Sequence, residues 1–293
     1  MDEVIPNSED FDILPELESS AAETTTAAVP GFIPLGASIA HFAFIILYCQ
    51  IARFLSNRLI TSPLYRIAVE EFICTVQLCA SNFELGVVTE VYGFSGYALG
   101  LFFTSMSYSL TFEDGTADPT ECLDKWLKRQ IGVSECVLRS ALSIGGAAVS
   151  YKAAKMFWAF RLIPEHANSF EGAVLCTASL QVSLLLGIIF EGGETFVNRL
   201  MQASDGFNML SGGLSDVAIT FCGLFVTGGY FNPSLSFAME FGCQGITGSD
   251  FFMIYWVGPA IATLIAFQTA PAILRAIQGE PRSTETQVKD HKD

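Results

Sequence analysis

The sequence has 293 residues, of which 51% are hydrophobic and only 15% are charged. A chain of this length with so few charges is too apolar for an ordinary soluble domain. Its formal net charge is −15, and we expect no nucleic-acid partner. Several apolar runs approach the roughly 20 residues that cross a hydrocarbon layer about 30 Å thick. The sequence therefore predicts an all-α membrane protein that passes several times through a lipid bilayer.

The chain begins with an acidic tail, which we place at residues 1–30. Its first 29 residues hold eight carboxylates and no Lys or Arg, and they are rich in Ser, Thr and Ala. Such a composition is typical of a disordered segment. No basic segment precedes the first apolar run and no clear small-residue cleavage site follows it. We therefore expect that run to remain in the protein as a membrane anchor.

Candidate membrane spans follow the tail. A channel domain is expected over residues 31–275, with a C-terminal tail at 276–293. The fourth run contains "SIGGAAVS", whose small side chains favour close contact between helices. The apolar runs lie at about 31–53, 67–89, 91–112, 137–162, 172–191, 208–228 and 250–273.

Basic residues predict the orientation, because cytoplasmic loops of membrane proteins collect Lys and Arg. Between the first two runs the chain carries Arg53, Arg58 and Arg66 and no acid, so this segment is expected in the cytoplasm. The acidic tail then lies on the far side, in a lumen or outside the cell. The basic residues around 125–129 and those of the C-terminal tail also read as cytoplasmic.

Two loops share one plan, "EDGTADPTECLDKWLKRQ" after the third run and "TGGYFNPSLSFAMEFG" after the sixth. Each has Gly, then Asp or Asn, then Pro, then a small hydroxyl residue and a helical stretch. Three spans separate the loops, and an odd number inverts the second relative to the first. Inverted repeats with broken helices are a design of channels and transporters.

The shared residues favour a short helix in each loop. Asp118 and Asn232 are good N-cap residues. The prolines that follow them suit the first helical position, where a missing N–H costs nothing. A single Asn-Pro pair is more typical of an ordinary turn, but the inverted copy favours two half-helices that meet inside the membrane beside a watery path. The predicted pore motifs are Asp118, Pro119 and Thr120, and Asn232, Pro233 and Ser234.

These loops resemble the paired Asn-Pro-Ala loops of the aquaporin family. The segment "FFMIYWVGPAIATLIAF" is similar to the family's last helix, and "EEFICTVQL" resembles its first helix, where a Glu braces a pore loop. Glu71 fits that place, although it could also be a carboxylate at the membrane interface. The resemblance covers residues 67–273. It implies an inverted repeat of six transmembrane helices plus two re-entrant half-helices, preceded here by the extra span 31–53.

Within the family, the chain resembles the unorthodox or superaquaporin branch, the proteins like aquaporins eleven and twelve. That branch departs from Asn-Pro-Ala in one loop and carries a Cys nine residues past the second motif, where Cys243 stands. Cys243 reads as a buried structural residue or as a redox-sensitive thiol. The resemblance also implies a homotetramer with one pore per subunit. It favours the endoplasmic reticulum membrane, with the plasma membrane as the alternative.

The expected constriction departs from that of water-selective members. Leu235 stands where those members place an Arg. By offset, Gly229, Thr220 and Ala98 fall at the other constriction positions. This set is wide and uncharged, and it predicts weak discrimination against solutes somewhat larger than water.

Asp118 is the greater departure. An ionised carboxylate can only accept hydrogen bonds, whereas an Asn amide can also donate one. The positive ends of two half-helices help such pores to exclude protons and cations. A carboxylate there would partly cancel that barrier, so we expect Asp118 to weaken charge exclusion.

The sequence thus predicts a passive channel for water, with glycerol-sized neutral solutes and hydrogen peroxide as further permeants. No nucleophile–base set, metal-binding helix or phosphate loop is recognisable, so we expect neither an enzyme nor a cofactor nor a metal site. Two alternatives stay open. One is a seven-span receptor, which suits the span number but not the repeated loops. The other is a non-conducting aquaporin relative with a structural role in the membrane.

Overall fold

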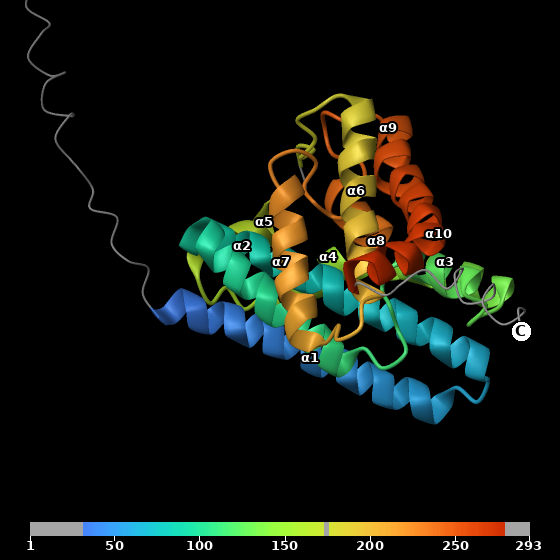
Figure 1. The fold of residues 1–293 in the computed structure, drawn as a ribbon. Coiled ribbons are helices and arrows are strands. Elements are labelled where there is room, and N and C mark those ends of the chain that lie inside the picture. Colours follow the sequence, from blue (N-terminus) through green and yellow to red (C-terminus); the bar gives the residue numbers. More distant parts are fainter. Residues whose placement is uncertain (1–31, 173–175, 279–293) are drawn as a thin grey trace, which may run out of the picture. The chain divides into compact units, whose positions relative to one another are not determined.

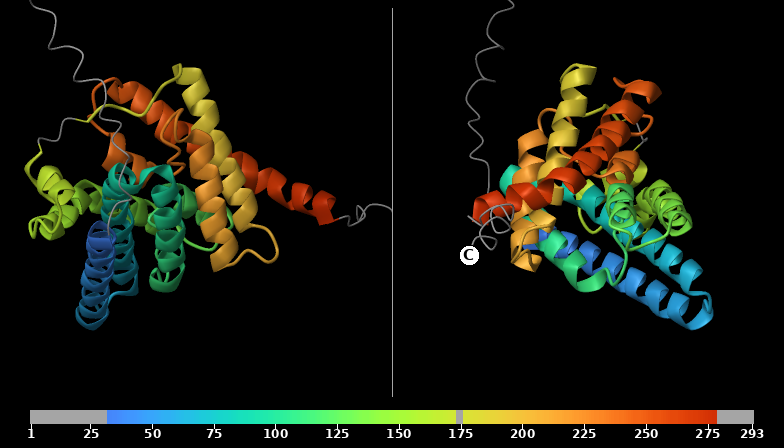
Figure 2. Two further views of the ribbon diagram at one scale, coloured as in Figure 1. Left: turned by 90° about the vertical axis from the view of Figure 1, so that its left-hand side faces the viewer. Right: turned by 45° about the vertical axis from the view of Figure 1, so that its right-hand side comes forward.

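The computed structural model describes residues 32–172 and 176–278. The expected acidic tail and nearly all of the expected C-terminal tail lie outside these ranges. The described chain is mostly helical and contains no β-strand, which confirms the all-α prediction. Its helices, shown in Figures 1 and 2, are α1 (Phe32–Leu59), α2 (Pro63–Thr111), α3 (Pro119–Leu127), α4 (Val133–Trp158), α5 (Pro164–Glu171), α6 (Leu184–Gln202), α7 (Met209–Gly223), α8 (Pro233–Glu240), α9 (Gly248–Phe252), a π-helical turn (Met253–Val257) and α10 (Gly258–Gln278).

The second and third apolar runs form one element that folds back on itself. Within α2, Gly93 adopts φ 66° and ψ −167°, a conformation that breaks the helix and that glycine tolerates. The two limbs lie side by side, as shown by the hydrogen bond that Gln77 Nε2 donates to Thr111 Oγ1 at 2.8 Å. The expected break near residue 90 is therefore a kink at Gly93.

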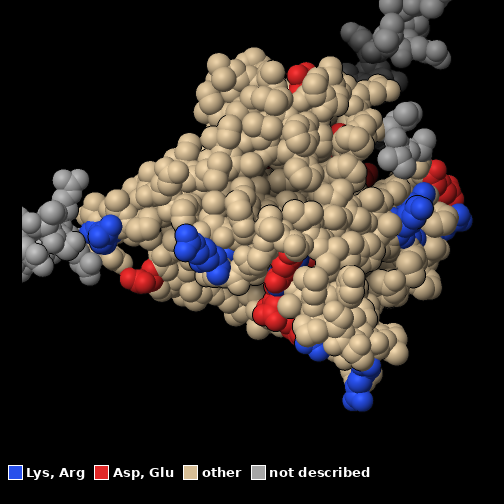
Figure 3. Space-filling model, turned by 90° about the vertical axis from the view of Figure 1, so that its right-hand side faces the viewer, with Lys and Arg blue, Asp and Glu red and all other residues tan. Residues whose placement is uncertain are grey.

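Three stretches of the described chain are long and apolar enough to cross a membrane: α1, α2, and α9 through α10. The apolar helix α7 is shorter. On the face drawn in Figure 3, acidic and basic side chains form scattered groups, and other residues cover most of the surface. Many large apolar side chains on these helices are exposed, among them Leu47, Phe103 and Leu264. Such a surface suits contact with lipid rather than with water.

Arg53 does not lie in a loop, which corrects the expectation from the sequence. It lies within α1 and is 1% exposed. Its Nε donates to Glu70 Oε1 at 2.6 Å, and its Nη1 donates to Gln77 Oε1 at 2.9 Å. The orientation argument at this end therefore depends on Arg58 and Arg66 alone. Arg53 instead holds the N-terminal helix against α2.

A second buried polar group fixes α1 near its other end. His41 Nε2 lies 3.8 Å from Glu84 Oε2, and both side chains are fully buried. Glu84 also accepts from Trp158 Nε1 at 2.7 Å and lies 3.0 Å from His166 Nε2. The extra helix is thus joined to α2 by polar contacts and packs on α2 and α4, and Glu84 in turn joins α2 to α4 and α5.

The predicted close contact of the fourth run is confirmed. A Cβ on Gly146 of α4 would lie 2.5 Å from the backbone oxygen of Phe72 in α2. No side chain fits in that space, so the two helices approach each other as closely as their backbones permit.

The fifth span was predicted at 172–191, and this boundary is wrong. Helix α6 begins only at Leu184. The backbone before it pairs with a distant loop: Ala178 N donates to Gln244 O at 2.8 Å, and Gln244 N donates to Cys176 O at 2.9 Å. These long-range hydrogen bonds take the place of the hydrogen bonds within a helix. The apolar composition of residues 176–183 therefore predicted a helix where none forms.

Candidate functional site

Each pore motif begins a short helix. Asp118 Oδ1 accepts from Thr120 N at 2.8 Å, and α3 begins at Pro119. Asn232 Oδ1 accepts from the backbone N of Ser234 at 2.8 Å, and α8 begins at Pro233. Both caps therefore have the geometry that the residue types predict.

The starts of the two short helices lie against each other. Asn232 Nδ2 donates to Ala117 O at 3.0 Å, which joins the second motif to the residue just before the first. Helix α3 packs on α4 and α10, and α8 packs on α2, α4 and the π-helical turn. Each short helix thus contacts spans from both halves of the chain.

Glu71 holds the first loop. Its Oε1 accepts from Thr116 N at 3.0 Å, from Thr116 Oγ1 at 2.6 Å and from Ala117 N at 2.5 Å. Its Oε2 lies 3.4 Å from Arg139 Nη1, and the Glu71 side chain is fully buried. The carboxylate thus fixes the backbone just ahead of Asp118, which is the geometry that a brace requires. The role of Glu71 as a brace stays a prediction, which this burial and these contacts support.

Glu191 holds the second loop in the same way, and sequence reasoning missed it. Its Oε1 accepts from Thr227 Oγ1 at 2.7 Å and from Tyr230 N at 3.2 Å, and its Oε2 accepts from Phe231 N at 2.7 Å. It is also fully buried.

A repeated spacing could have revealed this second brace. Four residues after each brace stands a Thr whose hydroxyl donates to the brace's backbone oxygen, Thr75 after Glu71 and Thr195 after Glu191, both at 2.8 Å. The pattern Glu-x-x-x-Thr thus occurs on one helix in each half of the described chain, α2 and α6. A search for a second copy of the first-helix motif would have found it.

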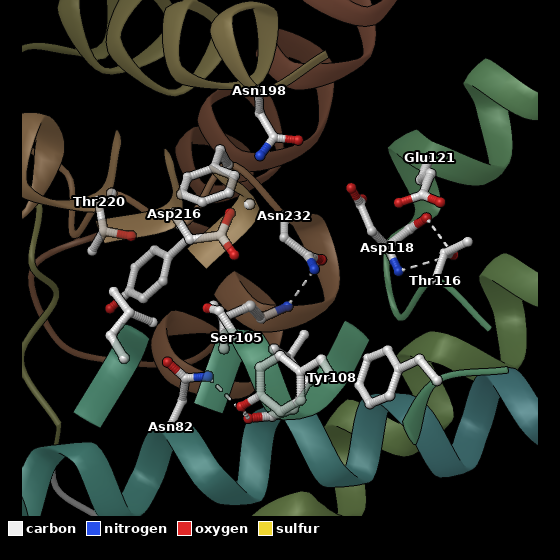
Figure 4. A pocket seen from close by; sticks show the side chains of 18 of the residues that line it. Asn82, Ser105, Tyr108, Thr116, Asp118, Glu121, Asn198, Asp216, Thr220 and Asn232 are labelled. Carbon is white, nitrogen blue, oxygen red and sulfur yellow. Dashed lines mark hydrogen bonds between the residues drawn. The ribbon is translucent and has the colours of Figure 1, made fainter. Parts of the chain in front are cut away.

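A cavity of about 560 Å³ adjoins the starts of both short helices (Figure 4). Leu78, Leu101 and Leu224 supply part of its apolar lining. Its polar lining includes Asn82, Ser105, Tyr108, Thr116, Asp118, Glu121, Asn198, Asp216, Thr220 and Asn232. A chamber lined by both kinds of side chain, with hydrogen-bonding groups from several helices, can hold small polar molecules.

Three of the four expected constriction residues line this cavity. Leu235, Gly229 and Thr220 are among the lining residues, but Ala98 is not. Tyr97 and Leu101 line it from the same helix as Ala98. Gly229 has φ 64°, and a Cβ there would lie 2.5 Å from Thr220 O. Only glycine fits this position without a shift of the backbone.

Asp118 is not an isolated carboxylate. Its Oδ2 forms an ion pair with Nη2 of Arg199, which comes from α6 in the other half of the chain. Asp118 is 8% exposed and Arg199 is 4% exposed. Sequence reasoning missed Arg199, although an ionisable residue inside an apolar helix is itself a signal of function.

Cys243 is not a free thiol in this structure. It forms a disulfide with Cys176, 67 residues earlier, beside the backbone pairing that precedes α6. Cys243 is buried, in agreement with the first of the two expected alternatives, but the disulfide with Cys176 was not expected from the sequence. The other cysteines of the described ranges are free, and no cluster of potential metal ligands occurs in those ranges.

Comparisons with known proteins place these features in a family. No family model matches the chain. It is 54% identical to aquaporin-11 of Milnesium tardigradum over 262 residues, which cover 89% of this chain and 97% of that protein. It is 24% identical to aquaporin-12 of Mus musculus, over 79% of this chain and 84% of the relative. It is 25% identical to aquaporin-11 of Homo sapiens, over 75% and 83% respectively.

The two capped short helices and the cavity at their starts therefore occur in a chain whose similarity to one aquaporin extends over nearly its full length. The chain belongs to the aquaporin family, in the branch of aquaporin-11 and aquaporin-12.

Proposed function

We propose that this membrane protein is a passive channel whose permeant moves through the cavity between the two short helices. The observation that carries the proposal is the bond from Asn232 Nδ2 to Ala117 O, which joins the two helix starts at the cavity wall. Two helix N-termini that face one polar chamber can orient water by hydrogen bonding and repel cations. Water is the default permeant.

We further propose the aquaporin layout for this chain. The two limbs of α2, then α4, α6, α7 and the stretch α9 to α10 supply six spans, with α3 and α8 as the re-entrant half-helices. The aquaporin-like core then covers residues 67–273 of a channel domain at 31–275, and α1 is an additional span within that domain. The brace contacts of Glu71 and Glu191, one in each half, support an inverted repeat.

The side chains at the expected constriction support permeants larger than water. At the position where water-selective family members place an Arg, Leu235 puts an uncharged side chain at the cavity wall. Gly229 contributes no side chain at all. Glycerol-sized neutral solutes and hydrogen peroxide are therefore proposed as further permeants. By the resemblance to the family, a homotetramer with one route per subunit is proposed as the assembly.

The disulfide supports the expected orientation. Arg58 and Arg66 favour the cytoplasm for the loop between α1 and α2, and three further crossings then bring the start of α6 to the far side. Cys176 and Cys243 lie at that end. Disulfides persist in oxidising compartments such as the lumen of the endoplasmic reticulum or the cell exterior. We favour the endoplasmic reticulum membrane, with the plasma membrane as the alternative.

Replacing Asn232 by alanine is expected to reduce water permeability strongly. The change removes the N-cap of α8 and the bond to Ala117, which would cost about 1 kcal/mol each and widen the gap between the helix starts. Stopped-flow light scattering on vesicles containing purified protein measures the permeability to water, glycerol and hydrogen peroxide.

The water permeability of vesicles with the wild-type protein should exceed that of protein-free vesicles. With Asn232→Ala, it should fall most of the way to the protein-free value. Serine in place of Asn208, which caps α7 and is not itself a cavity-lining residue, is the control and should leave permeability unchanged. A wild-type protein that conducts none of the three solutes would instead support the non-conducting relative.

A further inference from the structure

Arg199 approaches the cavity wall from behind the first pore motif. Besides its ion pair with Asp118, its Nη2 donates to Thr120 Oγ1 at 2.7 Å. Its Nη1 donates to Gln202 Oε1 at 2.6 Å and lies 3.7 Å from Glu121 Oε2. Arg199 itself is not among the residues that line the cavity, whereas Asp118 and Glu121 are. The guanidinium is therefore a buried positive charge placed just behind two acidic lining residues.

The carboxylate of Asp118 has few hydrogen-bonding positions left for a permeant. Oδ1 accepts from Thr120 N and from Thr120 Oγ1, both at 2.8 Å. Oδ2 lies 2.9 Å from the same hydroxyl and also accepts from Arg199 Nη2. A carboxylate offers about four lone-pair positions, and these contacts engage most of them. Asp118 thus faces its own helix and Arg199 more than it faces the chamber.

The ion-paired side chains in contact with Asp118 and Glu121 balance them in charge. Asp118 and Glu121 supply two negative charges, and Arg199 and Lys125 supply two positive ones, with Lys125 Nζ 3.3 Å from Glu121 Oε1. Arg stays protonated under all physiological conditions, so its charge is permanent. A close ion pair acts on a passing ion as a weak dipole rather than as a full charge. The pair Asp118–Arg199 therefore resembles the neutral Asn232 of the other motif.

We propose that Arg199 is a specificity-determining residue that neutralises Asp118 and so preserves the exclusion of cations at the first half-helix. This inference rests on the proposed channel function. It replaces the expectation that Asp118 weakens charge exclusion, which did not account for a partner on α6. Arg199 acts through Asp118, and is therefore a positioning and charge-compensating residue rather than a contact of the permeant.

The test measures water permeability and ion leak in the same vesicles. With Arg199→Gln, the unpaired Asp118 should raise the potassium leak about tenfold or more, as read with a potential-sensitive dye under a potassium gradient. The double variant Asp118→Asn with Arg199→Gln removes both charges and should return the leak to the wild-type level. Asp118→Asn alone leaves Arg199 uncompensated and should raise chloride leak, not potassium leak.

Lys128→Gln is the control for loss of a basic residue. Lys128 is the C-cap residue of the same half-helix, pairs with Asp124 at 2.6 Å and does not line the cavity. The ion leak of this variant should therefore equal that of the wild type. Arg199→Lys keeps the charge and should restore most of the exclusion of potassium.

Three outcomes would overturn the inference alone. The first is an Arg199→Gln protein that still conducts water and has an unchanged potassium leak. The second is a double variant whose potassium leak equals that of Arg199→Gln. The third applies if Arg199→Gln does not fold, and it is an unchanged chloride leak in Asp118→Asn. A wild-type protein that conducts no water would remove the proposed function, and this inference with it.

Discussion

Replacing Glu191 by alanine is expected to abolish water permeability and to lower stability by several kcal/mol. The substitution leaves the Thr227 hydroxyl and the backbone N–H groups of Tyr230 and Phe231 without their acceptor. Each buried donor that loses its partner costs about 1–3 kcal/mol. The loop that positions Asn232 would then lose its fixed geometry. Stopped-flow permeability and thermal unfolding in detergent measure the two effects.

Glu194, one turn further along α6, provides the matched control. It is 6% exposed, and neither of its carboxylate oxygens has a hydrogen-bond partner among the described residues. Glu194→Gln should therefore change permeability and unfolding temperature far less than Glu191→Ala. Equal losses in the two variants would show that any change on this helix is harmful, and the brace would not be supported.

Removing the disulfide is expected to lower the free energy of unfolding by about 4 kcal/mol, if the loss of chain entropy for a loop of 67 residues dominates. Cys243→Ser and Cys176→Ser should lower the unfolding temperature equally, because either change breaks the same bond. A reducing agent should lower it in the wild type and have no further effect on either variant.

Cys222→Ser is the control for this prediction, because Cys222 is exposed and free. Its unfolding temperature should match that of the wild type. A reducing agent that leaves the wild-type protein unchanged would show that the bond contributes nothing to stability.

The helix caps in the two predicted pore motifs could be predicted because their signals are local. An Asp or Asn followed by Pro contains both the cap and the first helical residue, and the caps at Asp118 and Asn232 follow from three adjacent residues. The brace Glu71 was predictable only through its resemblance to a family motif. Its partners, Thr116 and Ala117, lie 45 and 46 residues away, and no local pattern indicates them.

The errors share a cause, which is pairing between residues far apart in the sequence. Arg199 meets Asp118 across 81 residues, and Cys176 meets Cys243 across 67. Arg53 was read as a loop residue because its partners on α2 could not be seen from its neighbours. In the segment before α6, composition predicted a helix, but the backbone instead bonds to Gln244. Propensity and hydropathy contain no information on such contacts.

The central claim is that the cavity beside Asp118 and Asn232 is the route of the permeant, and a cavity-filling substitution tests it most directly. Leu235 lines the cavity, and its backbone N lies 3.3 Å from Asn232 Oδ1. Leu264 on α10 is 40% exposed, is not among the cavity-lining residues, and serves as the control site. In stopped-flow measurements on vesicles, Leu235→Trp should reduce water permeability to the level of protein-free vesicles, and Leu264→Trp should retain that of the wild type. Wild-type permeability in a folded Leu235→Trp protein would contradict the claim.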